Sequence, residues 1–295
     1  MDQIQLLSEL GAFLKCRRAE LSPHLVGLPD SAGPRRVAGL RREEVAQLAS
    51  ISTDYYARLE QGRMTASAPV LEAVARALRL DDDQRRYVFG LAGKETDRSP
   101  SQVPQRVQPQ LRRVLDDLTS IPAMVLGRCL DVIAWNSLGA ALITDFAAVP
   151  YEHRNYVRIL FTDPLMRTLH ADWTGAARAA VAQLRMESVK TPNDASLTAL
   201  VEELSSQDQN FCSWWSAHHV AALRVGTKLL NHPIVGELSL DWDTLTASTD
   251  LDQQLIVWTA KEDSLTHERL RILASWAAEH HHSAGGLPPN PVSVA

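Results

Sequence analysis

The chain has little cysteine and no long run of apolar residues. Its 295 residues include three widely spaced cysteines and no CxxC pair, which excludes a disulfide framework and a clustered thiolate metal site. We expect each cysteine to be a buried hydrophobic residue. The most apolar stretch, 121–135, is interrupted by Arg128 and Asp131 and is too short to cross a bilayer. Because the start shows no signal-peptide pattern, we expect a cytoplasmic protein with no membrane partner.

The motifs of common enzyme classes are missing as well. There is no GxSxG elbow, HExxH pair, P-loop or Rossmann glycine fingerprint. His218 and His219 are adjacent, so on a helix their side chains point about 100° apart and cannot hold one metal ion together. The histidines at 280–282 lie in a tail rich in Gly and Pro, without the fixed surroundings that a metal site needs. We predict no catalytic residue, no metal and no cofactor.

Acidic residues outnumber basic ones, and the formal net charge is −5. The imbalance is uneven: residues 1–98 hold 15 Lys and Arg against 14 Asp and Glu, whereas the remainder holds 15 against 21. In the N-terminal part the cations come in groups, at 35–36 and 41–42. Because phosphate contacts respond to the local field more than to net charge, this composition still permits DNA binding.

A hydrophobic content of 45% and the spacing of apolar residues predict two folded domains. Five helices are expected before residue 93: about 4–20, the two halves of 41–62, about 68–80 and about 81–93. Residues 94–109 contain three prolines and no apolar periodicity, which predicts a linker. The expected division is a first domain at 1–93, a second at 110–278 and a disordered tail at 279–295.

The second domain shows a mixed pattern. Alternation of apolar and polar residues predicts strands at about 123–128, 130–135, 226–230, 235–242 and 254–260. Between the second and third strands the spacing is helical, most clearly at 172–188, and a final helix is expected at 264–278. Two strands, several helices and three more strands describe an α+β domain with one antiparallel sheet.

The stretch 41–62, RREEVAQLASISTDYYARLEQG, predicts two short helices joined by a tight turn. Ser52 can cap the second helix by accepting a backbone N–H hydrogen bond. Tyr56 and Leu59 are expected to point inward, and Gly62 to end the helix. The opposite face presents four groups able to reach DNA: Thr53, Asp54, Tyr55 and Arg58. Such a helix fits the major groove. This pattern indicates a helix-turn-helix, and an ordinary helical hairpin is the alternative.

The order AxxAxxSxxYYxRLEQG, from Ala46 to Gly62, resembles the repressor and Cro type of helix-turn-helix in the xenobiotic-response-element (XRE) family. The resemblance covers about residues 4–92. It departs at Ser50, where this family usually places glycine in the turn, so we expect a positive φ with slight strain and the same fold. By position, the resemblance implies three base-reading residues: Thr53, Asp54 and Arg58.

Other residues near the motif are candidates for contacts with the DNA backbone. The resemblance implies such contacts for Arg41 and Arg42, where free N–H groups at a helix start add to the cations. Further candidates are Arg35, Arg36, Ser52, Tyr55 and Arg63. The alternative for Tyr55 is a side chain covering the core, and for the pair at 35–36 a solvated charge pair. Because one such unit reads few base pairs, we expect a homodimer on double-stranded DNA with an inverted repeat.

All seven tryptophans lie beyond residue 110. Such a set suits a cavity for apolar molecules, although a well-filled core is the alternative for each one. The segments DVIAWN (131–136), WTG (173–175), GTK (226–228) and HPxVGEL (232–238) resemble the ligand-binding domain of MmyB-like transcription regulators over about residues 107–276. The resemblance implies a PAS-like sensor fold and a small apolar, fatty-acid-like effector.

Six residues are candidates to line that cavity: Trp135, Asn136, Phe161, Trp214, Trp215 and His219. The aromatic rings would form walls, and Asn136 and His219 would bind a polar head group. Asn136 can instead cap the helix that follows, and His219 can be an ordinary helix histidine. These features predict a nucleoid-associated, homodimeric transcription regulator, and the resemblance to repressor proteins implies repression. The alternative is a protein-interaction module, such as an antitoxin-like or anti-sigma partner, that uses the same repressor fold.

Overall fold

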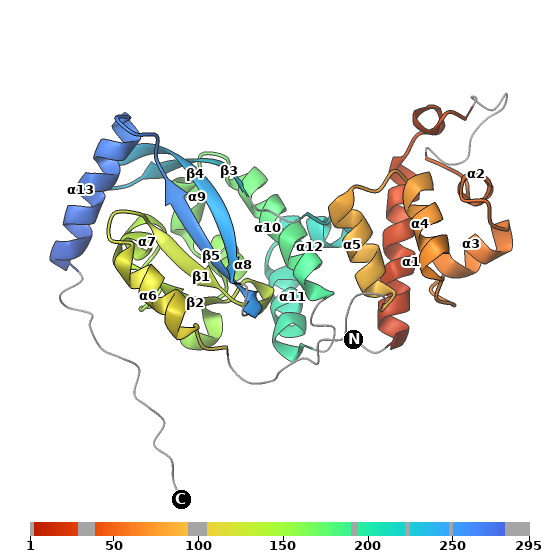
Figure 1. Ribbon diagram of the computed structural model, residues 1–295, viewed down its shortest axis with the longest axis horizontal. Coiled ribbons are helices and arrows are strands. Elements are labelled where there is room, and N and C mark those ends of the chain that lie inside the picture. Colours follow the sequence, from red (N-terminus) through yellow and green to blue (C-terminus); the bar gives the residue numbers. More distant parts are fainter. Residues whose placement is uncertain are drawn as a thin grey trace, which may run out of the picture. The chain divides into compact units, whose positions relative to one another are not determined.

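The computed structural model describes residues 3–28, 39–93, 105–189, 194–221, 225–247 and 250–280. The chain folds into two compact units (Figure 1). Unit 1 comprises Met1–Val103 and Arg178–Ala222, and unit 2 comprises Pro104–Ala177 and Leu223–Ala295. The segment 178–222, which the sequence placed in a domain at 110–278, thus packs with the N-terminal helices. Most of the expected linker and tail, 94–104 and 281–295, lies outside the described residues.

The described part of unit 1 is helical. The N-terminal helices are α1 (Gln3–Glu20), the 3-10 helix η1 (Pro23–Val26), α2 (Arg42–Leu48), α3 (Thr53–Glu60), α4 (Ala68–Ala77) and α5 (Asp82–Leu91). The five expected helices are confirmed. Three further helices belong to the segment 178–222: the end of α10 (Trp173–Ser188), then α11 (Ala195–Gln207) and α12 (Gln209–Ser216).

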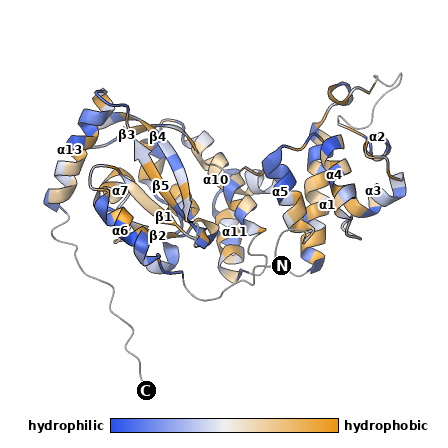
Figure 2. Cartoon of the chain, viewed as in Figure 1, coloured by the Kyte–Doolittle hydropathy of each residue, from blue (hydrophilic) through white to orange (hydrophobic). Residues whose placement is uncertain are grey.

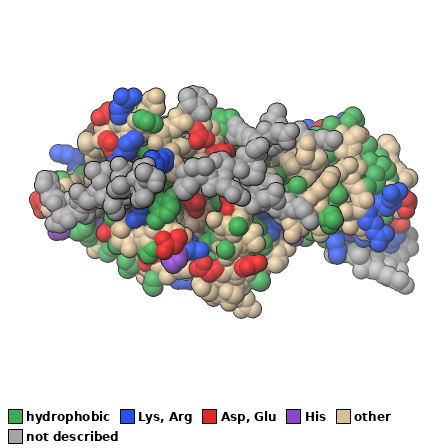
Figure 3. Space-filling model, turned by 90° about the horizontal axis from the view of Figure 1, so that it is seen from below, with side chains coloured by type: hydrophobic (Ala, Val, Ile, Leu, Met, Phe, Trp, Pro, Cys, Tyr) green, Lys and Arg blue, Asp and Glu red, His purple; other side chains and the backbone are tan. Residues whose placement is uncertain are grey.

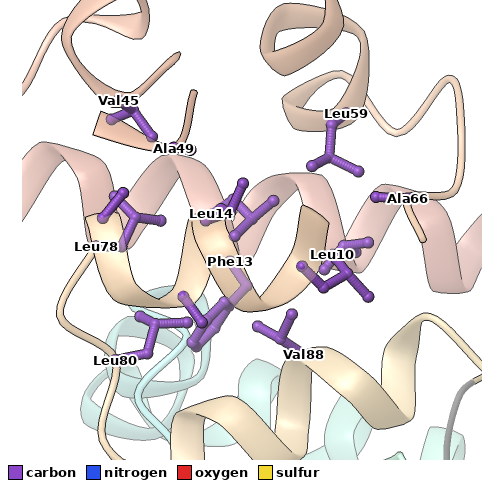
Figure 4. Close-up of a cluster of buried hydrophobic side chains, with 14 of the residues drawn as sticks. Leu10, Phe13, Leu14, Val45, Ala49, Leu59, Ala66, Leu78, Leu80 and Val88 are labelled. Carbon is purple, nitrogen blue, oxygen red and sulfur yellow. The ribbon is translucent and has the colours of Figure 1, made fainter. Parts of the chain in front are cut away.

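The core of unit 1 forms around α1 (Figure 4). Leu10, Phe13 and Leu14 of α1 are fully buried, and they meet apolar side chains from α2 to α5. The rings of Phe13 and Tyr87 lie 5.2 Å apart between their centroids. Figure 2 shows hydrophobic residues on α1 and α4 beside hydrophilic ones, as expected for helices with one buried face. Each fully buried side chain of this size stabilises the fold by about 1.5–3 kcal/mol.

Unit 2 contains one five-stranded antiparallel sheet with the order β2-β1-β5-β4-β3. The strands are β1 (Ala123–Leu126), β2 (Val132–Trp135), β3 (Val225–His232), β4 (Gly236–Ala247) and β5 (Asp250–Thr259). Met124 lies opposite both Trp135 and Ile256, so β1 joins the first hairpin to the three later strands. The five expected strands and the single antiparallel sheet are confirmed.

Helices cover this sheet. α6 (Pro109–Asp117) packs on the face that carries Ala123, Val125 and Leu255, and its Leu115 is fully buried there. The other helices of the unit are η2 (Arg128–Leu130), α7 (Ser137–Leu142), η3 (Tyr151–His153), α8 (Tyr156–Thr162), α9 (Pro164–Leu169), the start of α10 and α13 (Leu265–His280). α13 contacts α7 and β4, and it is the final helix that the sequence predicts.

Two expectations from composition can be compared with the fold. Within the described ranges, no helix is long and apolar enough to cross a membrane. Cys129 is buried, but Cys16 is half-buried and Cys212 is exposed. The expectation that all three cysteines are buried was therefore wrong for two of them, because a pattern of spacing does not tell which side of a helix faces solvent.

Candidate nucleic-acid interface

The turn between α2 and α3 has the conformation that the sequence predicts. Ser50 has a φ of 55°, in the left-handed region, and Ile51 N donates a hydrogen bond to Ala46 O at 3.0 Å. Ser52 Oγ accepts a hydrogen bond from Tyr55 N at 3.1 Å and so caps α3. The left-handed conformation is unfavourable for a serine. At Ser50 it is maintained by the Ser52 cap of α3 and by the hydrogen bond from Ile51 N to Ala46 O.

The inner face of α3 is fixed by burial. Tyr56 and Leu59 are fully buried, as the sequence predicts. Gly62 has a φ of 66°, and a Cβ atom there would lie 2.7 Å from Leu7 O of α1. No other residue fits this position without moving α1, so Gly62 both ends α3 and allows the close approach of α1.

The outer face of α3 is open to solvent. Thr53, Asp54 and Arg58 are exposed, whereas Tyr55 is half-buried and packs against the core of unit 1. Tyr55 thus makes the core contact that was its alternative, and a phosphate contact of its hydroxyl group stays a prediction. Lys and Arg side chains gather on the surface in the region of α2 and α3 (Figure 3). A helix with three exposed polar side chains and a basic surrounding can enter the major groove.

Glu60 is a residue of this site that the sequence analysis missed. Its side chain is fully buried, and it accepts hydrogen bonds from Arg18 Nε at 2.6 Å and from Arg42 Nε at 2.9 Å. Arg18 also donates to Leu40 O at 2.7 Å. Burial alone raises the pKa of Glu60, but the hydrogen bonds from the two arginines outweigh it and hold the pKa below its usual value. The cluster ties α1 and the start of α2 to the end of α3.

The cations expected at phosphates have different surroundings. Arg42 is bound to Glu60, although 43% of its side chain remains exposed. Arg41 is half-buried, with Nη1 3.5 Å from Glu43 Oε1. Arg63 is exposed just after the end of α3, and Ser52 is exposed at its start. Arg35 and Arg36 lie outside the described residues. A phosphate role for these residues stays a prediction, and Arg42 has a structural role in addition.

Unit 2 contains a partly open cavity of about 630 Å³. It lies between α13, the end of β5 and residues 120–121. Apolar side chains of Ile121, Trp258 and Leu270 line it, and charged or titratable groups are contributed by His267, Glu268 and Arg271. Trp258 is 1% exposed, and its Nε1 has no hydrogen-bond partner among the residues that the structure describes. Of these residues, the sequence indicated only Trp258, as one of the seven tryptophans. The sequence gave no signal for the α13 residues, because periodicity does not tell which strand a helix faces.

Comparison with known families supports this division of roles. Residues 107–273 match the MmyB-like transcription regulator ligand binding domain, and residues 9–88 match a helix-turn-helix domain. The first match spans more than half of the chain. The chain belongs to the MmyB-like transcription regulators. It is accordingly a DNA-binding transcription regulator with a domain for a small-molecule ligand. No curated protein matches the chain.

Three of the six residues expected to line the ligand cavity of this MmyB-like regulator lie in unit 2. Asn136 Oδ1 accepts hydrogen bonds from Gly139 N at 2.7 Å and Ala123 N at 3.0 Å, and its Nδ2 donates to two backbone carbonyls. It is thus the helix cap that was the alternative to a ligand contact. Trp135 packs on Phe146 with ring centroids 5.2 Å apart. Phe161 is buried against another tryptophan of the unit.

The other three of the six lie in unit 1. Trp215 stacks on Phe211 at 5.9 Å between centroids, and Trp214 is half-buried on the same helix. His219 Nδ1 lies 3.4 Å from Arg17 Nη2, and burial together with the charge of Arg17 lowers the pKa of His219. The structure therefore does not bring the six residues together within one unit, although the MmyB-like match runs through both.

Proposed function

We propose that α3 reads base edges in the major groove of an operator, and that a ligand in unit 2 changes the affinity for this DNA. The observation that carries the first part is the division of α3 into a fixed inner face and an exposed outer face with Thr53, Asp54 and Arg58. An arginine can pair with guanine through two hydrogen bonds, which contributes about 1–3 kcal/mol of discrimination. Threonine and aspartate can contact other base edges in the same groove.

The proposed binding form is a homodimer on an inverted repeat, acting as a repressor. One α3 offers three base-reading side chains, which is too few for a unique site in a genome. Two copies related by a two-fold axis, with half-sites roughly one helical turn apart, double the contacts. The resemblance of 46–62 to repressor and Cro proteins supports repression.

The proposed effector is a small apolar molecule with an anionic head, such as a fatty acid. The cavity of unit 2 supports this class, because Trp258 and Leu270 offer apolar walls and Arg271 and His267 offer positive or hydrogen-bonding groups. Trp258 Nε1, which lacks a partner among the described residues, can donate a hydrogen bond to a ligand oxygen.

Selection of bound sequences from a random DNA library, using the full chain, tests the DNA part of this proposal. Two similar half-sites in opposite orientation are expected. A single half-site, or no enrichment at all, would contradict it.

Titration with palmitate tests the effector part, with tryptophan fluorescence and DNA affinity as readouts. We expect saturable binding that shifts DNA affinity, weakened roughly threefold to tenfold in Arg271→Gln, since an exposed ion pair contributes little. Arg128→Gln, outside the cavity, is the matched control. Binding without any change in DNA affinity would contradict the regulatory role of the cavity.

A further inference from the structure

A largely buried polar cluster in unit 1 lies apart from the outer face of α3. Glu9 of α1 meets three groups from elsewhere in the chain: Tyr87 of α5, Arg185 of α10 and His218 after α12. Tyr87 Oη donates to Glu9 Oε1 at 2.7 Å, and His218 Nδ1 lies 2.9 Å from the same oxygen. Arg185 Nη1 forms an ion pair with Glu9 and lies 3.0 Å from His218 Nδ1. Arg185 and His218, which lie 176 and 209 positions from Glu9 in the sequence, therefore share its carboxylate.

The surroundings make this cluster costly to break. The side chain of Arg185 is 3% exposed and that of Glu9 is 19% exposed. Arg185 also donates from Nη2 to Trp215 O and lies over the Trp215 ring, 4.1 Å from its centroid. Removing one partner of a buried pair leaves a charge without compensation. The Arg185–Glu9 ion pair therefore stabilises the packing of α10 against α1.

Apolar contacts surround the cluster. Met186 and Val220 are buried in the same hydrophobic core as Leu10 and Phe13 of α1. A second polar contact lies nearby, where Arg17 Nη2 donates to the carbonyl oxygen of residue 217 at 3.1 Å. The segment 178–221 is thus part of the core of the helix-turn-helix unit, although the family match assigns it to the ligand-binding domain.

The backbone at His218 is strained in support of this contact. His218 has a φ of 52° directly after the end of α12. A residue with a Cβ atom adopts this conformation only at a cost, on the order of 1 kcal/mol, unless its neighbours hold it. Here the ring of His218 is held between Glu9 and Arg185. The left-handed conformation at His218 thus accompanies the contact between its ring and Glu9 of α1.

α10 extends beyond the cluster into the other unit. The helix starts at Trp173 in unit 2 and ends at Ser188 in unit 1. At its start, Trp173 Nε1 donates to Leu160 O at 3.0 Å, and Arg167 lies over the Trp173 ring, 3.8 Å from its centroid. Each end of one helix is thus held by specific side-chain contacts within a different unit.

We propose that the segment 178–221 is a docking element through which unit 2 controls the stability of the N-terminal helices α1 to α5. Glu9, Arg185 and His218 form the contact that holds this segment, which we call the latch. Helix α10 is the link to unit 2. The outer face of α3 stays exposed while the latch is closed, so the docked form leaves the base-reading residues accessible. The coupling is a property of the free protein, and its test needs neither DNA nor an effector.

Hydrogen exchange of the full chain tests the latch. Arg185→Gln should speed exchange of α1 and α5 by roughly tenfold or more, because it leaves Glu9 without its charged partner. The matched control is Arg178→Gln, because Arg178 is an exposed arginine on the same helix. In this variant the hydrogen exchange of α1 and α5 should equal that of the wild type. Faster exchange confined to α10 and α12, or equal effects of the two variants, would overturn the docking role.

A second pair of variants tests the link. Trp173→Phe removes the hydrogen bond to Leu160 in unit 2, and it should speed exchange of α1 and α5 about threefold to fivefold. Trp276→Phe, on α13, is the control and should have no such effect. In the double variant with Arg185→Gln, the Trp173 effect should vanish, because the latch is already open. The proposal that α10 links unit 2 to the stability of α1 would be overturned by either of two results. One is unchanged hydrogen exchange of α1 in Trp173→Phe alone, and the other is additive effects on exchange in the double variant.

Discussion

Two carboxylates, the buried Glu60 and the largely buried Glu9, hold unit 1 together at the residue scale. Each lies on a helix among apolar neighbours, and each binds more than one cationic or hydrogen-bonding group. Buried charges of this kind give little net stability compared with apolar residues, but they specify which helices meet, because any other arrangement leaves a charge unpaired.

Loss of the Glu60 charge should destabilise unit 1. Glu60→Gln leaves Arg18 buried without a counter-charge, so we expect a loss of about 3 kcal/mol, mostly from Arg18, since Arg42 is half exposed to solvent. Calorimetric unfolding of the full chain measures it. Glu43→Gln is the control: Glu43 is 64% exposed and should cost less than about 0.5 kcal/mol. Equal losses of unfolding free energy in the two variants would show that the buried cluster contributes no more to stability than an exposed carboxylate.

Glu9 should make the free energy of unfolding of unit 1 depend on pH in the acidic range. Burial by itself raises the pKa of Glu9, but the hydrogen bond to His218 and the charge of Arg185 outweigh it and lower the pKa from 4.5 to about 2. A carboxyl whose folded pKa is lowered stabilises above its unfolded pKa and loses that contribution as the pH falls through its folded pKa. The contribution, about 3 kcal/mol at neutral pH, should disappear between pH 4.5 and about 2.

The measurement is the free energy of unfolding of unit 1 across this pH range, for the wild type and for Glu9→Gln. The groups that face Glu9 are Arg185, His218 and Tyr87. We expect the difference between the two proteins to shrink steadily from pH 4.5 downward. A difference that stays constant over this range would contradict the lowered pKa.

Local residues could be predicted from the sequence, and distant partners could not. Ser50 and Ser52 act within their own turn. The resemblance to the XRE family implied the positive φ of Ser50, and the position of Ser52 before the second helix predicted the helix cap. Glu60 and Glu9 are paired with residues far along the chain. A single sequence holds no signal for such a pairing beyond a charge among apolar neighbours.

The helix-turn-helix turn is tuned at the element scale by two serines with opposite effects. Ser50→Gly should stabilise unit 1 by about 0.5 kcal/mol, because relief of the left-handed strain exceeds the entropy cost of glycine. Ser52→Ala should destabilise it by about 1 kcal/mol through loss of the α3 cap. Denaturant unfolding of both variants checks the pair. Destabilisation by Ser50→Gly would mean that the serine side chain stabilises the turn.

Periodicity predicted the elements themselves well. The alternation in 254–260 gave β5, and the acids at 81–83 marked the start of α5, where Asp81 accepts a hydrogen bond from Gln84 N at 2.8 Å. Periodicity did not predict where α10 packs. It shows that a helix has an apolar face, but not which surface of the protein that face meets.

At the scale of the whole molecule, the boundaries of the family match differ from the boundaries of the two compact units. The MmyB-like match covers 107–273 without interruption, but 178–222 folds with the helix-turn-helix. The same limit applies to the ligand residues chosen from the sequence. Seven tryptophans in one half of the chain indicated aromatic packing, but composition could not separate those of unit 1 from those of unit 2.

The central claim, that α3 reads DNA through its outer face, gives opposite predictions for two neighbouring arginines. Arg58 lies on that face, whereas Arg63 is exposed beyond the end of α3. Arg58→Ala should relax base preference, at a cost of about 1–3 kcal/mol on the preferred site. Arg63→Ala should weaken binding to all sequences alike and lower the salt slope by about one unit. Arg63 is a better phosphate probe than Arg42, whose removal also disturbs Glu60.

The most direct measurement is fluorescence anisotropy of the full chain on DNA from upstream of its own gene, across a salt series and against a scrambled competitor. The wild type should bind tightly and yield only to a large excess of the competitor. Arg58→Ala should lose this preference, and Arg63→Ala should keep it with a shallower salt slope. Wild-type binding that prefers its upstream DNA but is unchanged in Arg58→Ala would contradict the assignment of α3 as the reading helix.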